Sequence, residues 1–472
     1  MATYIDHVFD PEEFRKTGHA LVEILAGHLE SCRNGKQEKV INYTRPEDEL
    51  EYWHNYKGKD PLEIWQDVIS RSTQSYHPGY MGHQVATTAP LANFAGLVGL
   101  HLNNGLAVYE VGPAGNAIEK WLIDKIKPYF GYDTFSDGFL TSGGTIANLT
   151  TLLCARSVKA PGVWKNGTKE KYAFMVSEEA HYCIDRAVRI MGWGDDGIIK
   201  IPVDEQFKMQ TDLLPEYLEK AKQKGVQVLG VVGSFPTTST GIHDNLEAIA
   251  AFCKLHSLWF HVDGAHGGPA VFSEKHNHLT NGIQYADSII VDAHKMMINP
   301  GLATIVLFKD GNHSFQTFSQ EASYLFGRHD ADWYNYGKRT MECTKLMMSL
   351  RLMTMIQVYG IEMFGAHIDH MYQLGKILAE KVTERPNMEI GVVPESNIVC
   401  YRIKENDQEL ANRKNSWIRN KLLEEGDFFI VQTVLKNTVF MRSAIMNPMT
   451  TPEVFDRLLD RIESLNYSFS NP

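Results

Sequence analysis

The segment 288–301 reads SIIVDAHKMMINPG and places Lys295 directly after a short apolar run. Residues 288–291 are typical of the end of a buried strand. A lysine at this position needs an explanation, because burying an ammonium group costs several kcal/mol. Either the side chain carries its charge out to solvent, or desolvation lowers the pKa of the amine and makes it a nucleophile toward an aldehyde. The residues upstream of this segment distinguish between these two interpretations.

The composition is that of a soluble globular protein. A length of 472 residues predicts roughly two to four structural units. A net charge of −11 argues against nucleic acid and against an acidic membrane surface as partners. The cysteines are scattered, without a CxxC motif, and are expected to be free thiols in a reducing compartment. They are Cys32, Cys154, Cys183, Cys253, Cys343 and Cys400.

The chain carries no recognisable targeting or membrane segment. Its first residues, MATYIDH, have neither a basic start nor an apolar core, so we expect no signal peptide. The most apolar window, residues 89–102, is shorter than the about 20 residues that cross a bilayer. We therefore expect a cytoplasmic protein.

Strand-like and helical patterns alternate between residues 85 and 340. The apolar runs are 171–176, 226–235, 258–262, 288–291 and 304–308. Helical patterns at 213–224 and 245–256 separate several of them. This alternation predicts an α/β fold with a mainly parallel sheet. Ligands bind such sheets at the carboxyl ends of the strands, in the loops that follow.

The flanking regions predict two further parts. Asp10-Pro11-Glu12-Glu13 is a helix start. The helix presents an apolar face that needs either its own body or another subunit as a partner. That face consists of Phe14, Leu21, Ile24, Leu25 and Leu29. After residue 344 the pattern predicts one long helix to 384, rich in core methionines. Strands at 390–393, 398–403, 428–434 and 438–444 follow, with helices at 416–425 and after 451.

We accordingly predict three domains. Residues 1–85 form an N-terminal helical segment, 86–345 a large domain and 346–472 a small α+β C-terminal domain.

Several of the predicted strand ends carry polar residues. TSGGTIANL at 141–149 opens a helix and offers backbone amides to a phosphate, although glycines before helices are common. SEEAH at 177–181 ends in His181, which is either satisfied near a helix start or lies flat on an aromatic ring. The hydroxyl-rich loop 236–241, which includes Thr238, is either an ordinary turn or part of the same site.

HVDGAHGG at 261–268 places Asp263 at the end of a buried strand, where a carboxylate needs a partner. A pyridinium N–H would be one, and the small Ala265 leaves room for a flat ring. A metal site built from His261, Asp263 and His266 is the rival interpretation. In an extended segment the first two share a face and the third points away, so no metal site is predicted.

Pyridoxal 5′-phosphate is bound through its phosphate, its ring, its ring nitrogen and its aldehyde. The sequence offers a group for each of them: a phosphate cradle, a stacking histidine, a carboxylate and an amine. The motifs TSGGTIANL, SEEAH, HVDGAHGG and DAHK, in this order, closely resemble the group II pyridoxal-phosphate-dependent amino acid decarboxylases. The resemblance runs from His77 to the final helix. It implies a fold type I large domain, an N-terminal segment that packs on the dimer partner, and a homodimer with active sites at the interface.

The resemblance also implies roles for single residues. Lys295 would form the Schiff base with the cofactor, and Asp263 would bind the pyridine nitrogen. Ala265 would lie under the ring and His181 above it. Three residues would hold the phosphate, and a fourth, Thr238, would lie beside the cofactor. The three phosphate-binding residues are Gly144, Thr145 and His294. Asp292 is left out of the site, because some relatives have asparagine there and a carboxylate could not face a phosphate directly.

Two substrate contacts follow from the same resemblance. His83 replaces part of an Asn-Gln pair of acid-specific relatives, so it is expected to face the substrate, and glutamate specificity is in doubt. Arg442 is at the position where glutamate decarboxylases bind the substrate carboxylate; a structural salt bridge is the alternative. In the segment 324–337, Tyr334 is chosen over Tyr336 as the acid that protonates the α-carbon; the alternative is that both merely pack.

The predicted reaction is α-decarboxylation of an L-amino acid to an amine and CO2. The alternatives are an oxidative deaminating decarboxylase, another carbon–carbon lyase, an aminotransferase or a non-catalytic scaffold. The substrate stays open among aromatic, acidic and diamino acids.

Overall fold

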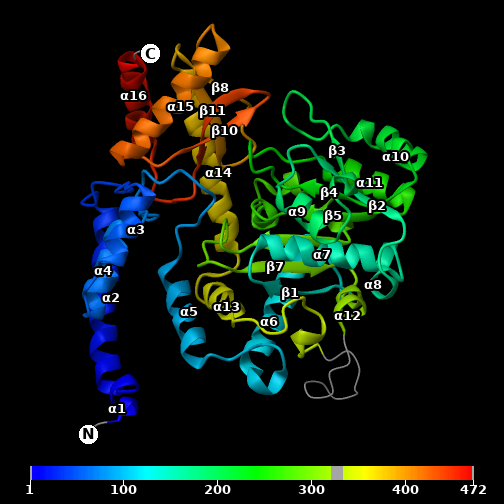
Figure 1. Ribbon diagram of the computed structural model, residues 1–472, viewed down its shortest axis with the longest axis horizontal. Helices are drawn as coiled ribbons and strands as arrows, with labels where there is room; N and C mark the ends of the chain where they lie inside the picture. Colours follow the sequence, from blue (N-terminus) through cyan, green and yellow to red (C-terminus); the bar gives the residue numbers. More distant parts are fainter. Residues whose placement is uncertain (1–2, 320–332, 470–472) are drawn as a thin grey trace. The chain divides into compact units, whose positions relative to one another are not determined.

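The computed structural model describes residues 3–319 and 333–469 (Figure 1). The chain divides into two compact units. The small unit combines Met1–His83, Ile377–Gly391 and Cys400–Pro472, and the large unit combines Gln84–Lys376 and Val392–Val399. Both units are therefore built from segments that are distant in sequence. The division into three domains that fold independently stays a prediction.

The large unit is organised around a seven-stranded sheet in the order β1-β7-β6-β5-β4-β2-β3. The strands are β1 (Asp137–Thr141), β2 (Lys171–Ser177), β3 (Ile198–Ile201), β4 (Val226–Ser234), β5 (Trp259–Asp263), β6 (Ser288–Asp292) and β7 (Thr304–Phe308). β7 is antiparallel to β6 and β1, and the remaining pairs are parallel. The predicted mainly parallel sheet is confirmed. The carboxyl ends of β1, β2, β4, β5 and β6 consequently share one edge.

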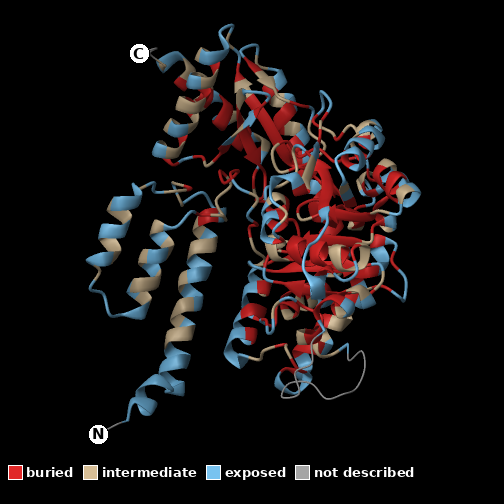
Figure 2. Cartoon of the chain, turned by 45° about the vertical axis from the view of Figure 1, so that its right-hand side comes forward, coloured by how far each residue is buried: buried red, intermediate tan, exposed pale blue. Residues whose placement is uncertain are grey.

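Helices cover this sheet, so its central strands are buried along their whole length (Figure 2). The helices are α5 (Pro90–Leu102), α6 (Pro113–Ile126), α7 (Gly144–Lys159), α8 (Val163–Asn166), α9 (Cys183–Ile190), α10 (Leu214–Gln223), α11 (Leu246–His256), α12 (Asn312–Phe318) and α13 (Ser349–Tyr359). α10 and α11 confirm the two predicted crossover helices. Burial on both faces explains why these strands are continuous apolar runs.

The single long helix predicted for 344–384 is wrong. The structure has two helices, α13 and α14 (Glu362–Thr383), and residues 344–348 are not helical. Gly360 separates the helices at a φ of +80°, in the left-handed region that ends helices. Four of the methionines in this stretch are buried as predicted, namely Met347, Met348, Met355 and Met371, whereas Met353 and Met363 are only partly buried.

The small unit contains a four-stranded sheet in the order β10-β11-β9-β8. Its elements are β8 (Met388–Ile390), β9 (Ile398–Ile403), α15 (Gln408–Glu425), β10 (Val431–Leu435), β11 (Thr438–Ala444) and α16 (Pro452–Ser468). β9 and β11 have the predicted bounds. The strand predicted at 390–393 is shifted, because β8 pairs with β9 from Met388 to Ile390. The helix predicted at 416–425 starts earlier, since the Asp407 side chain caps it by accepting the Leu410 N–H.

The N-terminal helices are α1 (Tyr4–Val8), α2 (Pro11–Arg33), α3 (Pro46–His54) and α4 (Pro61–Arg71). Asp10 caps α2 as predicted, because its side chain accepts the Glu12 N–H at 2.9 Å. Cys32 is the one buried residue of α2. Within a single chain, Phe14 and Leu25 of the predicted apolar face of α2 are exposed, and the other three residues of that face are partly buried.

None of the helices in the described ranges is long and apolar enough to cross a membrane.

Candidate functional site: a cavity at the strand ends

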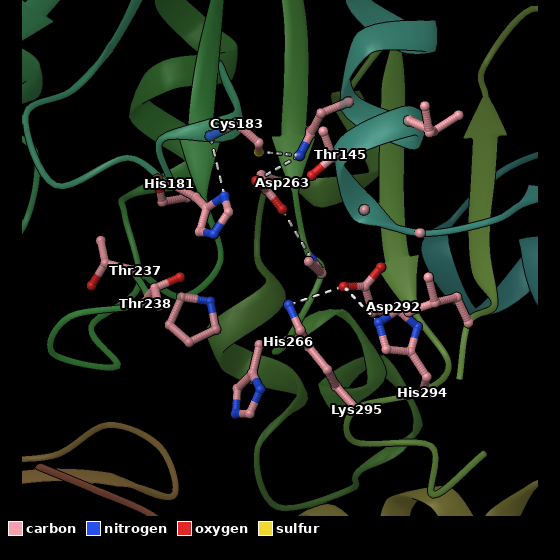
Figure 3. A pocket seen from close by; sticks show the side chains of 18 of the residues that line it. Thr145, His181, Cys183, Thr237, Thr238, Asp263, His266, Asp292, His294 and Lys295 are labelled. Carbon is pink, nitrogen blue, oxygen red and sulfur yellow. Dashed lines mark hydrogen bonds and ion pairs between the residues drawn. The ribbon is translucent and has the colours of Figure 1, made fainter. Parts of the chain in front are cut away.

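A cavity of about 310 Å³ lies in the large unit, where β1, β2, β4, β5 and β6 end (Figure 3). This volume is in the range of small-ligand sites. The cavity brings together eight of the residues that the sequence predicted for a site. They are Gly144, Thr145, His181, Thr238, Asp263, Ala265, His294 and Lys295. They converge because each lies at or just after the end of a strand at the same edge of the sheet, and His294 and Lys295 share the loop after β6.

Asp263 is the last residue of β5 and is held by two hydrogen bonds. Its Oδ1 accepts the Ala265 N–H at 3.2 Å, and its Oδ2 accepts a hydrogen from Asn148 Nδ2 at 3.0 Å. The side chain still lines the cavity (Figure 3). A carboxylate fixed in this way can accept a hydrogen bond from a ring N–H.

Lys295 follows β6, and its Nζ lies 2.9 Å from Asp292 Oδ2. Burial on its own would lower the pKa of Lys295, but the charge of Asp292 and the hydrogen bond to it, together with the charges of Asp263 and Cys183, raise that pKa above its usual value. The lowered pKa expected from the sequence is therefore wrong. The amine of the free enzyme carries a proton because it has a carboxylate as its neighbour.

Asp292 lines the cavity, although the sequence argument left it out of the site. Thr304 donates to its Oδ1, and His294 Nε2 lies 3.6 Å from its Oδ2. Burial would raise the pKa of Asp292, but the charges of Lys295 and His294 and the hydrogen bonds from Thr304 and Lys295 outweigh burial and lower it. The carboxylate thus faces two basic side chains. The neighbouring His294 and Lys295 are both mostly removed from solvent, and two basic residues next to each other after a buried strand were a sign in the sequence that a counter-charge is needed.

The start of α7 forms a cradle for an anion. The helix begins at Gly144, and the first N–H groups of a helix have no partner within it. A Cβ on Gly144 would lie 3.0 Å from Asp292 Oδ2, and Gly143 has a φ of +130°. The backbone conformation of Gly143 therefore favours glycine, and a side chain at position 144 would crowd Asp292. His294 lies in the same cavity, with its Nδ1 2.9 Å from the Ala303 carbonyl oxygen.

His181 is a neutral imidazole. Burial lowers its pKa, and the opposing charge of Asp263 does not compensate. The Cys183 N–H donates to Nδ1 at 3.3 Å, so the ring hydrogen is on Nε2. Figure 3 shows His181 beside Asp263, with Thr238 on the neighbouring loop. An uncharged ring at this place can stack on a flat aromatic ligand.

The remaining predicted residues do not line this cavity. Tyr334 packs against Tyr109 with 5.4 Å between the ring centroids. Residues 324–332 of the loop that includes it lie outside the described ranges. Tyr336 is buried, with Lys345 Nζ 4.3 Å from its ring centroid.

His83 and Arg442 belong to the small unit. Arg442 is 5% exposed, and its Nε and Nη2 have no hydrogen-bond partner within the described ranges. No structural salt bridge of Arg442 is found among those residues. The His83 ring lies 5.8 Å from that of Phe429. Partial burial and the charges of Arg442 and Arg419 lower the pKa of His83, so a neutral imidazole lies near a buried guanidinium.

Asn148 and Cys183 are among the cavity-wall residues for which the sequence predicted no role. Asn148 lies four residues after Gly144 and therefore on the same face of α7, which helical spacing could have indicated. Among residues 3–319 and 333–469, no group of three or more His, Cys, Asp or Glu side chains is arranged to hold a metal ion.

The residues of the cavity fit pyridoxal 5′-phosphate. The start of α7 and His294 can receive the phosphate, Asp263 the ring nitrogen, and Lys295 the aldehyde. Ala265 and His181 line the same cavity and would lie against the ring. When bound, this cofactor supplies an electron sink for a carbon atom that loses CO2.

Comparisons with known proteins agree with this site. Residues 46–404 match the family described as the pyridoxal-dependent decarboxylase conserved domain. The chain is 26% identical to an aromatic-L-amino-acid decarboxylase of Bacillus atrophaeus over 96% of this chain and 95% of the relative. It is 27% identical to the cysteine sulfinic acid decarboxylase of Rattus norvegicus over 92% of this chain and 93% of the relative.

Solved structures share the fold. The crystal structure of mouse CSAD has a TM-score of 0.90 at 24% identity and covers 98% of this chain and 100% of that chain. The Oryza sativa TDC structure with PLP and tryptamine has a TM-score of 0.89 at 18% identity, with coverages of 98% and 99%. The large unit thus has the fold type I architecture. With this fold, this cavity and a family match over most of its length, the chain belongs to the pyridoxal-dependent decarboxylases and is an amino acid decarboxylase that uses pyridoxal 5′-phosphate.

Proposed function

We propose that the enzyme removes the α-carboxyl group of an L-amino acid and releases the amine and CO2. The observation that carries this proposal is the convergence of Asp263, Lys295 and His181 in one cavity with the phosphate cradle. Asp263 would keep the ring nitrogen protonated, Lys295 would hold and release the cofactor aldehyde, and His181 would stack on the ring. In this arrangement electron density leaving the scissile bond is drawn toward a protonated ring.

Arg442 is proposed to bind the carboxylate of the substrate, and His83 to contact the substrate. The buried guanidinium has two nitrogens without a hydrogen-bond partner among the described residues. A buried cation of this kind is stabilised by an anion with two oxygens. An amino acid carboxylate has this shape. The neutral His83 would add a hydrogen-bonding group without repelling a cationic or aromatic side chain.

Product analysis with the purified holoenzyme tests the function. CO2 release is measured for each standard amino acid, for diaminobutyrate and for cysteine sulfinate, and the organic product is identified. Equal amounts of amine and CO2 support the proposal. Aldehyde with ammonia would show an oxidative decarboxylase, and a keto acid without CO2 an aminotransferase. A purified protein without a visible absorbance band would point to a scaffold.

Asp292→Asn is expected to shift the attachment of the cofactor to lower pH. The variant lacks the charge that raises the pKa of Lys295, so the amine becomes neutral at a lower pH. At pH values below the pKa of the amine, each unit by which that pKa falls gives about tenfold more neutral amine. Apoenzyme is mixed with pyridoxal 5′-phosphate at a series of pH values, and attachment is followed by absorbance. The exposed Asp310→Asn is the control. An unchanged or upward-shifted profile contradicts the role of Asp292.

Tyr334 is proposed as the acid that protonates the α-carbon, supplied by the partner's copy of the loop. Tyr334→Phe should still release CO2 but should form aldehyde and ammonia, with dissolved oxygen as the oxidant, in place of most of the amine. Tyr336→Phe is the matched control, because that hydroxyl is buried and has no hydrogen-bond partner among the described residues. Amine and aldehyde are quantified for both variants. An unchanged amine yield for Tyr334→Phe removes this tyrosine from the mechanism.

A homodimer in the cytoplasm is also proposed. Support for the dimer comes from apolar residues that a single chain leaves exposed on α2 and α5, such as Phe14 (63%), Phe94 (48%) and Leu97 (53%). Support for the compartment comes from the six cysteines, all free.

Light scattering should give the wild type twice the 53.4 kDa chain mass. Leu97→Asp should shift the mass toward that of one chain, because it places a charge in the proposed interface. Leu255→Asp is the control, since Leu255 is equally apolar and 77% exposed but lies on α11. A wild type that runs as a single chain would overturn the proposed dimer.

A further inference from the structure

His261 was a candidate metal ligand in the sequence, but it is neither in the cavity wall nor near a metal cluster of the described residues. It lies two residues before Asp263 on β5 and is completely buried. Both ring nitrogens have partners. Nε2 is 2.8 Å from Asn148 Oδ1 and 3.4 Å from Thr151 Oγ1. Nδ1 is 2.9 Å from Ser288 Oγ and 3.1 Å from the Ser288 carbonyl oxygen. Burial lowers the pKa of His261 to about 4, so at neutral pH the ring carries a single N–H.

The hydrogen bonds around His261 form a chain that ends at Asp263. Trp259 Nε1 donates to Ser288 Oγ at 2.9 Å, and Asn148 Nδ2 donates to Asp263 Oδ2 at 3.0 Å. These side chains are at most 1% exposed, apart from Asp263. Water therefore cannot replace any of these bonds without opening the core.

The two ends of the chain set its direction. An indole N–H can only donate, and an ionised carboxylate can only accept. Because Asn148 presents its N–H side to Asp263, its Oδ1 must accept, and His261 Nε2 is the group that donates to it. With the ring hydrogen on Nε2, His261 Nδ1 accepts from the Ser288 hydroxyl, which in turn accepts from Trp259. The Ser288 carbonyl oxygen, 3.1 Å from Nδ1, then receives no hydrogen from the ring. Every group in the chain thus donates toward Asp263.

We propose that Asn148 and His261 are positioning residues that act on the cofactor through Asp263. His261 fixes the Asn148 amide, and the amide holds the Asp263 carboxylate in the orientation that meets the ring nitrogen. This inference rests on the proposed contact between Asp263 and that nitrogen. Without His261, the amide could turn its oxygen toward the carboxylate, and two acceptors would face each other.

A cofactor analogue separates positioning from general stability. Deazapyridoxal 5′-phosphate has C–H in place of the ring nitrogen, so it cannot use Asp263 but keeps the phosphate and the aldehyde. Dissociation constants for both ligands are measured with the apoenzyme by equilibrium dialysis. The readout is the preference for pyridoxal 5′-phosphate, that is, the ratio of the two constants. A variant with a damaged fold loses affinity for both ligands and keeps this ratio.

Asn148→Leu and His261→Leu should each reduce the preference roughly tenfold or more, because a hydrogen bond to a charged group is lost or misdirected. His261→Gln should keep it, since a glutamine amide can donate to Asn148 and accept from Ser288. Thr150→Val is the matched control on α7, because the buried Thr150 hydroxyl has no hydrogen-bond partner among the described residues. It should leave the preference unchanged.

Asp263→Asn distinguishes the two possible failures. If Asp263→Asn loses the preference while Asn148→Leu and His261→Leu retain it, Asp263 contacts the nitrogen and the positioning role is overturned. If Asp263→Asn itself retains the preference, the proposed contact fails, and with it the inference built on it. If His261→Gln loses the preference as much as His261→Leu does, the proposal that His261 orients the Asn148 amide is also overturned.

Discussion

Lys295→Ala is expected to lower turnover by at least roughly 10³-fold while the protein stays folded and still binds pyridoxal 5′-phosphate. Lys295 is the only lysine of the cavity wall among the described residues, so the variant offers the aldehyde no amine with which to form a Schiff base. The start of α7, His294 and Asp263 are unchanged and can still hold the phosphate and the ring nitrogen. Removal of the lysine also leaves Asp292 with His294 as its nearest basic side chain, at 3.6 Å.

Borohydride reduction provides the measurement. It should tether the cofactor to the wild-type chain, and peptide mass spectrometry should locate the label at Lys295. The variant should release its cofactor on denaturation after the same treatment. Lys309→Ala is the control, because Lys309 follows β7 outside the cavity and its replacement should keep both the label and the activity. A label on any other lysine would refute the assignment.

Asp263→Asn is expected to lower turnover roughly 10²–10³-fold, with a much smaller loss of bound cofactor. An asparagine has nearly the same shape and can keep one of the two hydrogen bonds that Asp263 accepts from Ala265 and Asn148, because its amide has a single acceptor oxygen. It has no negative charge to keep a ring nitrogen protonated. The electron sink is therefore weakened more than the binding site. Cofactor content is measured by absorbance after release, and turnover by CO2 production.

The ratio of these two losses decides the role of Asp263. A variant that keeps near wild-type turnover would mean that the ring nitrogen does not face Asp263. Equal losses of cofactor and turnover would mean that Asp263 serves mainly to hold the cofactor.

The sequence by itself determined the sheet and the main residues of the cavity. His181, Asp263 and Lys295 each follow an apolar run, and alternating strands and helices predict a mainly parallel sheet. Since parallel strands end at one edge, the position of a residue just after a strand is enough to predict that it meets the others. The same logic found Thr238 and the glycines before α7. It rests on local patterns, which is why it did not require coordinates.

Helix and strand ends were less predictable, because they depend on single backbone conformations and on pairing partners. Gly360 could continue a helix or end one, and only its φ of +80° in the folded chain shows that α13 ends there. β8 is shifted from the predicted run because its position follows the register with β9, which a pattern of apolar residues cannot fix.

Only the tertiary structure decided the electrostatics of the site. A buried lysine alone would have a lowered pKa, but Asp292 at 2.9 Å reverses the direction for Lys295. Asn148 and His261 are 113 residues apart, and their hydrogen bond exists because α7 packs on β5. The sign of a pKa shift and the direction of a hydrogen-bond chain depend on which side chains lie within a few ångströms. Distances between residues that are far apart in sequence are set by packing, so these properties of the protein become readable only in the folded chain.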